Sequence, residues 1–77
     1  NEAQKTNAAV YSYRQTVYVN TKDLGKADIY VYNITGQLVA SRLSVQGMNE
    51  IGLPQTGNYI VKVTARNSTV VKKVLLQ

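Results

Sequence analysis

The chain has 77 residues, which is enough for one small domain, and its formal net charge is +5 at pH 7. It contains six tyrosines but no cysteine, histidine, tryptophan or phenylalanine. The lack of cysteine excludes a disulfide framework and a thiolate zinc site, and the lack of histidine removes the commonest general base and metal ligand. We therefore expect no enzyme, no metal site and no cofactor.

The first residues, NEAQKTNAAV, are polar and rich in alanine and asparagine. This composition is typical of a linker, and it lacks the apolar core of a signal peptide. No apolar run in the chain approaches the length that spans a membrane. Because the chain does not begin with methionine, we expect a piece of a longer protein, with a linker at 1–9 and one domain at 10–77.

After the linker, nearly every segment is typical of a strand or a turn. Short runs rich in β-branched residues and tyrosine alternate with turn residues, which predicts strands at 10–13, 16–20, 27–34, 38–44, 48–53, 57–65 and 68–76. About seven strands at this spacing predict an all-β antiparallel sandwich. The stretch TKDLGKAD has no sustained apolar stripe and is expected to be a loop.

Alternation within the strands predicts which side chains face the core. In GNYIVKVTAR, Tyr59 and Val61 share one side of the strand, whereas Lys62 lies on the other. Tyr30 and Tyr32 are expected to be half exposed, with their rings packed and their hydroxyls in water. The predicted core consists of Val17, Val19, Ile29, Val31, Leu43, Ile51, Tyr59, Val61 and Val63.

Three turns depend on particular residues. Gly36 in NITGQL is expected to take the positive φ of a tight hairpin. In LPQTGNY, Pro54 begins a turn and Gly57, through positive φ or close backbone approach, leads into the next strand. In ARNSTV, Asn67 is the expected left-handed residue of a hairpin between the last two strands. Asn33 and Asn67 also begin Asn-x-Ser/Thr triplets, which we interpret as turn chemistry rather than glycosylation sites.

The last predicted strand, STVVKKVLL, contains the adjacent lysines Lys72 and Lys73. Since neighbouring residues of a strand face opposite sides, a central strand would direct one lysine into the core. An edge strand or a bulge avoids this, because the aliphatic stem packs while the ammonium group reaches solvent. Charges on an edge strand also discourage pairing with other chains, and this protection is the simplest role for the two lysines.

The basic residues gather near the end of the chain. No acidic residue follows Glu50, whereas three lysines and one arginine do. A basic face can bind nucleic acid or an anionic surface, but it is more often simply solvated. Most tyrosines lie in the first half of the chain, away from this charge, so stacking on single-stranded nucleic acid is not expected.

Taken in order, IYVYNITGQLV, GMNEIGLP, TGNYIVKV and KKVLLQ resemble the C-terminal sorting domain of the type IX secretion system, in the type A family of Bacteroidetes bacteria. The resemblance covers about residues 10–77 and implies an immunoglobulin-like sandwich. It implies that the cargo crosses the periplasm and that the domain, read by translocon components, directs it through the outer membrane to the cell surface or the medium. A sortase usually removes such a domain and joins the cargo to anionic lipopolysaccharide.

The resemblance also implies roles for particular residues. The family's secretion-signal motif falls on Gly57, Tyr59, Lys72, Lys73, Val74, Leu75 and Leu76, and its turn glycine falls on Gly36. The sortase would act in or just before NEAQKTNAAV, where Ala8 and Ala9 lie. Family members commonly carry a Pro-Asn-Pro turn after the first strand, whereas this chain reads VYSYRQTVYV, as if that strand ran further. This departure suits the alternative of a surface component that keeps its sorting-type domain uncleaved.

A second alternative is a carbohydrate-binding or adhesin sandwich whose tyrosines stack on sugar rings. The tyrosines of the first half are Tyr11, Tyr13, Tyr18, Tyr30 and Tyr32. Hairpin packing of amphipathic rings explains the same pattern without a ligand. We therefore prefer the sorting domain to the adhesin.

Overall fold

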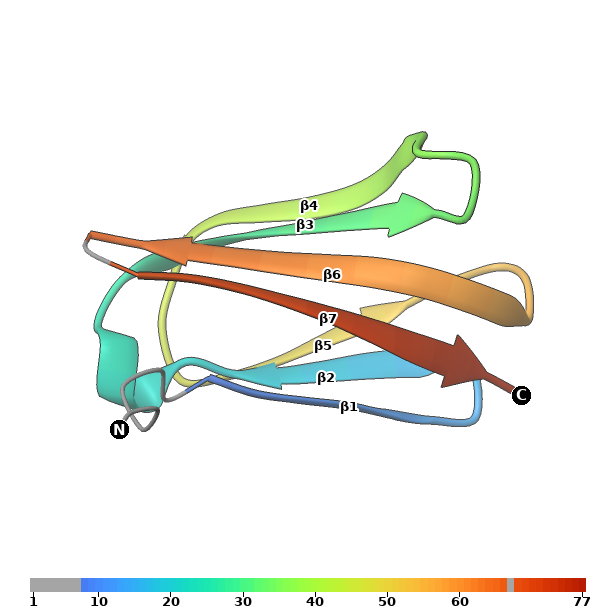
Figure 1. Cartoon of the computed structure of the whole chain (residues 1–77). Helices are drawn as coiled ribbons and strands as arrows, with labels where there is room; N and C mark the ends of the chain where they lie inside the picture. The colour runs from blue at the N-terminus through green and yellow to red at the C-terminus, as the bar shows by residue number, and fades with distance from the viewer. Residues whose placement is uncertain (1–7, 67) are drawn as a thin grey trace.

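The computed structural model describes residues 8–66 and 68–77, and within them the chain forms two antiparallel sheets packed face to face (Figure 1). The smaller sheet has the strand order β1-β2-β5 and the larger sheet β4-β3-β6-β7. The strands are β1 (Ala9–Tyr13), β2 (Thr16–Asn20), β3 (Ala27–Asn33), β4 (Leu38–Val45), β5 (Met48–Gly52), β6 (Gly57–Ala65) and β7 (Ser68–Leu76). The predicted all-β, immunoglobulin-like sandwich is confirmed. The predicted loop TKDLGKAD contains one turn of 3-10 helix, η2 (Lys22–Leu24).

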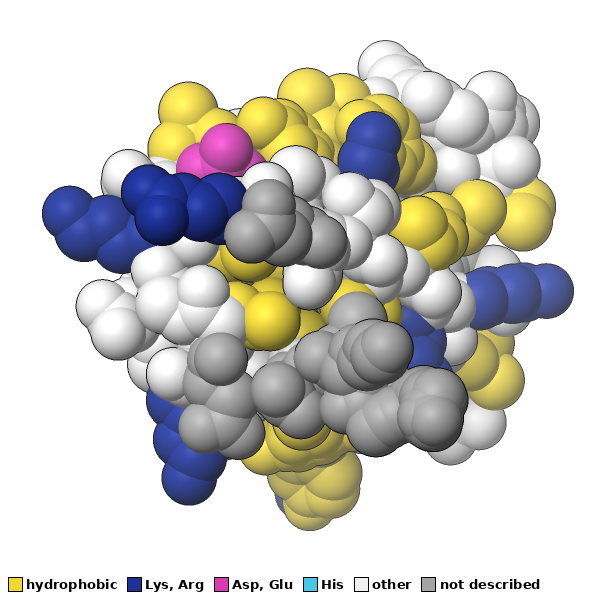
Figure 2. Space-filling model, turned by 60° about the vertical axis from the view of Figure 1, so that its left-hand side comes forward, with side chains coloured by type: hydrophobic (Ala, Val, Ile, Leu, Met, Phe, Trp, Pro, Cys, Tyr) yellow, Lys and Arg dark blue, Asp and Glu magenta, His cyan; other side chains and the backbone are white. Residues whose placement is uncertain are grey.

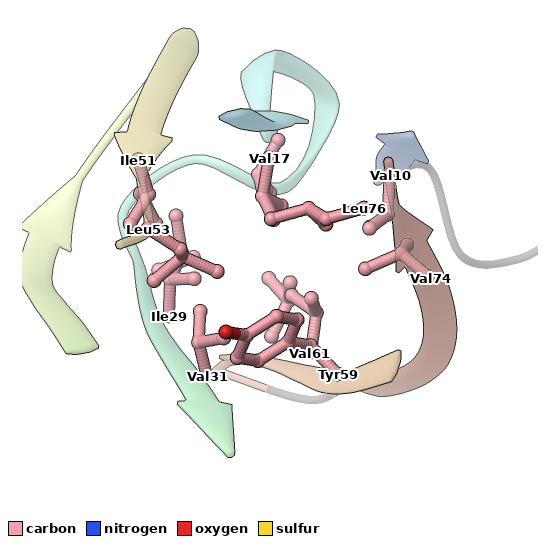
Figure 3. Packing of buried hydrophobic residues seen from close by; sticks show 13 residues of the cluster. Val10, Val17, Ile29, Val31, Ile51, Leu53, Tyr59, Val61, Val74 and Leu76 are labelled. Atoms are coloured by element: carbon pink, nitrogen blue, oxygen red, sulfur yellow. The ribbon is translucent and has the colours of Figure 1, made fainter. Parts of the chain in front are cut away.

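The core lies between the two sheets and consists of hydrophobic side chains from both (Figure 3). Eight of the nine predicted core residues are buried, and Tyr30 and Tyr32 are half-buried as expected. The core also contains five residues outside the predicted list, namely Val10, Ala27, Leu53, Val74 and Leu76. The contribution of β1 was missed because alternation alone does not show which strands cover each other.

Leu43 is 62% exposed, so its predicted place in the core is wrong. The pairing of β3 with β4 shifts register between Ala27 and Ile29, where Val45 lies opposite Ala27 and Arg42 lies opposite Ile29. Two residues of β3 are thus matched by three of β4, and such a β-bulge reverses the alternation of the longer strand. Leu43 consequently faces away from the core, although it has the same parity as Val45.

The β3–β4 hairpin is organised by the Asn33 side chain, as the turn interpretation of this asparagine predicted. Its Oδ1 accepts the N–H of Thr35 at 3.1 Å, the hydroxyl of Thr35 at 2.7 Å and the N–H of Gln37 at 2.9 Å. Gly36 has φ +92°, which confirms the expected positive φ. The predicted turn residue Asn67 lies outside the described residues, but β6 and β7 do form the expected antiparallel pair.

The stretch VYSYRQTVYV is a hairpin, so the expectation of a longer first strand is wrong. Tyr13 pairs with Thr16, and the two residues between them form a tight turn in which Arg14 has φ +57°. The carbonyl of Gln15 accepts the N–H of Leu53 at 2.9 Å, which ties this turn to the chain beyond β5. The turn reverses the chain without the proline of the family pattern.

Candidate functional site

The candidate site is the terminal strand β7, which lies at one edge of the larger sheet (Figure 1). It pairs with β6 in a continuous register from Ser68 opposite Ala65 to Leu76 opposite Gly57. An edge position, rather than a bulge, therefore accommodates the adjacent lysines. Lys72 and Lys73 are both exposed.

The predicted terminal motif divides between the two sides of β7. Val74 and Leu76 are buried and lie beside Val10 of β1 in the core (Figure 3). Lys73 and Leu75 alternate with them and point to the outside of the sandwich. Val74 and Leu76 therefore build the fold, whereas Lys73 and Leu75 are available to another molecule.

β1 flanks the last part of β7, and the two strands run in the same direction (Figure 1). The Ser12 hydroxyl donates to the backbone carbonyl of Leu75 at 2.8 Å. Ser12 was not a predicted site residue, and its only signal in the sequence is its parity with the inward-facing Val10. Because this bond and the packing of Val10 occupy the edge of β7 near its end, a partner strand could pair there only by displacing β1.

The other half of the predicted motif, Gly57 and Tyr59, lies directly beside the terminal residues. Gly57 pairs with Leu76, and Tyr59 pairs with Val74. The Tyr59 ring is buried, and its hydroxyl donates to the backbone carbonyl of Gln55 at 2.9 Å across the turn that Pro54 begins. The structure thus brings the two parts of the motif together. Gly57 and Tyr59 of β6 support the end of β7.

The possible cleavage region lies at the opposite end of the sandwich from this cluster. β1 begins at the left of Figure 1, whereas β7 ends at the lower right, beside the β1–β2 turn, and the β3–β4 turn with Gly36 lies at the upper right. Ala8 packs against the core, and Ala9 is the first residue of β1, paired with Asn20. The predicted linker is otherwise outside the described residues.

Comparison with protein families matches residues 13–77 to the secretion system C-terminal sorting domain. The chain belongs to this family. It is a C-terminal sorting signal of type IX secretion, which implies export to the cell surface or release from the cell. The comparison with curated proteins finds no match.

Apart from the buried Tyr59, the tyrosines of this sorting domain lie on the outsides of the two sheets. Tyr11 stacks on Tyr18 on the outside of the smaller sheet, with ring centroids 5.2 Å apart and an interplanar angle of 28°. Tyr30 and Tyr32 belong to β3, on the outside of the larger sheet. The two groups therefore cannot form one platform for a sugar chain, whereas Tyr11, Tyr13 and Tyr18 do share the outside of the smaller sheet.

An open pocket of about 400 Å³ lies at the end of the larger sheet where β3 begins and β6 ends. It is lined by Lys26, Ala27, Asp28, Ser44, Thr64, Ala65 and Arg66. Asp28 Oδ1 accepts the N–H of Ser44 at 2.9 Å, and this bond holds the bulge of β4. Within the described residues, no group of acidic side chains suits a metal ion, and no helix has the length and apolarity to cross a membrane.

Proposed function

We propose that this chain is a type A sorting domain of Bacteroidetes that type IX translocon components read while its passenger is in the periplasm. The secretion signal consists of Gly57, Tyr59 and the terminal residues of β7. The observation that carries the proposal is the construction of β7, which closes the core with Val74 and Leu76 and keeps Lys72, Lys73 and Leu75 at the surface. The family match, which includes all of β2 to β7, supports it.

In this proposal the domain is an address and catalyses nothing. A sortase cuts the linker and joins the passenger to anionic lipopolysaccharide on the outer membrane. The chain itself has neither histidine nor cysteine for a general base or a thiolate nucleophile. The partners of the domain are then the translocon and the sortase, with lipopolysaccharide bound to the passenger.

Ala8 and Ala9 limit where the sortase acts. Because Ala8 packs against the core and Ala9 pairs with Asn20, a protease could reach the bond between them only after β1 had separated from β2. A cut on the amino-terminal side of Ala8 leaves all seven strands intact. We therefore expect cleavage before Ala8, within the polar part of the linker.

The test is to fuse residues 1–77 behind a periplasmic reporter in a bacterium with a type IX system, and to determine the mass of the reporter recovered from the cell surface. A strain with an inactive sortase is the control. We expect a reporter that ends before Ala8 and carries lipopolysaccharide in the parent strain, and an uncut fusion in the control. An uncut fusion on the surface of the parent strain would overturn the cleavage proposal in favour of a retained surface component.

A further inference from the structure

The outside of the larger sheet is unusually apolar for the exposed side of a sandwich. The registers place Leu38, Tyr32, Ile60 and Lys73 in one row across the four strands, and Ser41, Tyr30, Lys62 and Val71 in the next. Leu75 follows at the end of β7, opposite Asn58. We define the outer face by its apolar and basic members: Tyr30, Tyr32, Leu38, Ile60, Lys62, Val71, Lys73 and Leu75.

Polar residues normally cover the solvent side of an antiparallel sheet. On the outer face, however, Val71 is 64% exposed and Leu75 50% exposed, and both flank Lys73. Figure 2 shows hydrophobic side chains exposed along the upper side of the molecule, where β3 and β4 lie in Figure 1, with basic and acidic side chains beside them. Four strands about 5 Å apart and rows about 7 Å apart give the face an area of roughly 300 Å². This area includes the two lysines, and the largest apolar patch on a typical monomer covers about 300–600 Å² and is often functional, so the apolar part of the outer face is a candidate interaction site.

The charge of the outer face is positive. Lys62 and Lys73 are diagonal neighbours, since Lys73 lies opposite Ile60 and Lys62 lies two residues further along β6. The pocket at the end of the same sheet adds Lys26 and Arg66. Its acidic residue, Asp28, offsets one of these two charges and leaves the pocket with a net charge of +1. A surface complementary to this face is therefore apolar, with carboxylates placed to meet the two lysines.

We propose that the sorting apparatus reads this domain through the outer face, by docking it against a protein surface on which Asp or Glu side chains stand among apolar ones. The proposal rests on the proposed function and names the chemistry of the partner. Val74 and Leu76 are buried, and β1 occupies the edge of β7, so recognition of the folded domain uses the outward residues of that strand. Two lysines among six apolar side chains suit a protein surface better than a polyanion, which would need a denser basic patch.

The small area of the outer face also fits this role. Stable complexes bury about 800 Å² on each partner, and contacts much smaller than this are usually weak and transient. A face of roughly 300 Å² therefore supports a reversible encounter. A sorting domain that is released after its passenger has been delivered needs such a reversible contact.

Lys22 provides a matched control for Lys73, because Lys73 belongs to the outer face, whereas Lys22 is an exposed lysine of η2, outside the larger sheet. We expect Lys73→Glu, and more strongly the Lys62→Glu/Lys73→Glu double variant, to lower surface export of a fused reporter at least tenfold, since like charges across an interface are repelled by ~1.4 kcal/mol or more. Lys22→Glu makes the same charge change and is expected to export like the parent. Thermal melts of the isolated domains should be unchanged for all three variants.

The apolar part of the outer face has its own matched pair. Leu75 is 50% exposed on the outer face, whereas Met48 is 51% exposed on β5 of the other sheet. Both can be replaced by serine without opening the core. Leu75→Ser should lower export severalfold, and Met48→Ser should leave it unchanged.

Three results would overturn the proposal. The first is parent-like export of the Lys62→Glu/Lys73→Glu variant, and the second is an equal loss for Lys22→Glu and Lys73→Glu, which would show that only the net charge is read. The third is Lys73-dependent binding of the purified domain to phosphatidylglycerol vesicles, which would indicate a membrane surface instead of a protein. If the parent fusion itself stays inside the cell, the proposed function fails, whereas export of the parent with all variants refutes the outer face alone.

Discussion

Gly57 shows how one backbone angle explains a motif residue. Its φ is +127°, a region that L side chains rarely adopt, and a Cβ built there meets no atom within 4 Å. Of the two expected reasons for glycine, positive φ is therefore the correct one, and close backbone approach is not. The glycine is needed for the chain to turn into β6, where it pairs with Leu76.

Gly57→Val should therefore lower the free energy of unfolding by about 1–3 kcal/mol through backbone strain. Gly52 is the control, because it also has open space around its Cβ but no positive φ. Gly52→Val should change the stability by less than about 0.5 kcal/mol. Denaturant melts of both variants measure the difference, and equal effects would show that backbone conformation is not what requires glycine at 57.

Thr21 is the buried polar residue of the core region. Its side chain is fully buried, and its hydroxyl Oγ1 has no hydrogen-bond partner among the described residues. Its backbone is satisfied, since its N–H donates to the carbonyl of Gly47 and its carbonyl accepts the N–H of Leu24, both at 2.9 Å. The hydroxyl alone therefore carries the cost of desolvation.

Thr21→Val has nearly the same shape and removes that hydroxyl. We expect the free energy of unfolding to stay constant or to rise by up to about 1 kcal/mol, because an unsatisfied buried group is lost. Denaturant titration of the isolated domain measures this. A loss of more than about 1 kcal/mol would mean that the hydroxyl makes a stabilising bond.

At the scale of the strand, β7 serves the fold and the signal together. Val74 and Leu76 belong to the core, and three residue pairs join the end of β7 to Gly57, Asn58 and Tyr59. Removing a buried aliphatic side chain costs about 2–5 kcal/mol, and a domain of this size has only about 5–10 kcal/mol in total. A truncated signal is therefore an unfolded domain as well.

Deletion of Val74 to Gln77 should accordingly abolish the cooperative thermal transition of the isolated domain. Deletion of Gln77 alone is the control, because this residue is exposed and follows the last strand. The shorter deletion should melt like the parent. A cooperative transition that survives the longer deletion would show that β7 does not complete the core.

The strands could be predicted from the sequence because each has a clear alternation between turn residues, but β4 shows the limit of that reasoning. Its bulge depends on the bond between Asp28 and the Ser44 N–H, which joins residues of two strands. Leu43 therefore has the parity expected of a core residue, but the bulge makes it face outward. The positions of Lys72 and Lys73 at an edge were predictable, because the core cannot hold an unpaired charge.

At the scale of the whole molecule, the sequence could indicate the motif residues but not how they divide. Whether Leu75 or Leu76 faces the core depends on the register with β6, and the cover over β7 depends on β1. The grouping of Tyr32, Ile60 and Lys73 on one face likewise requires the strand order of the larger sheet. Strand order and register therefore decide which residues of the motif share a surface.

The central claim is that this folded domain carries a passenger out of the cell by type IX secretion. The most direct measurement is the accessibility of a reporter, fused in front of residues 1–77, to antibody on intact cells of a strain with a working type IX translocon and of a matched strain without one. We predict a reporter exposed on the first strain and retained inside the second. Equal exposure on both strains, or retention in both with a folded domain, would contradict the account.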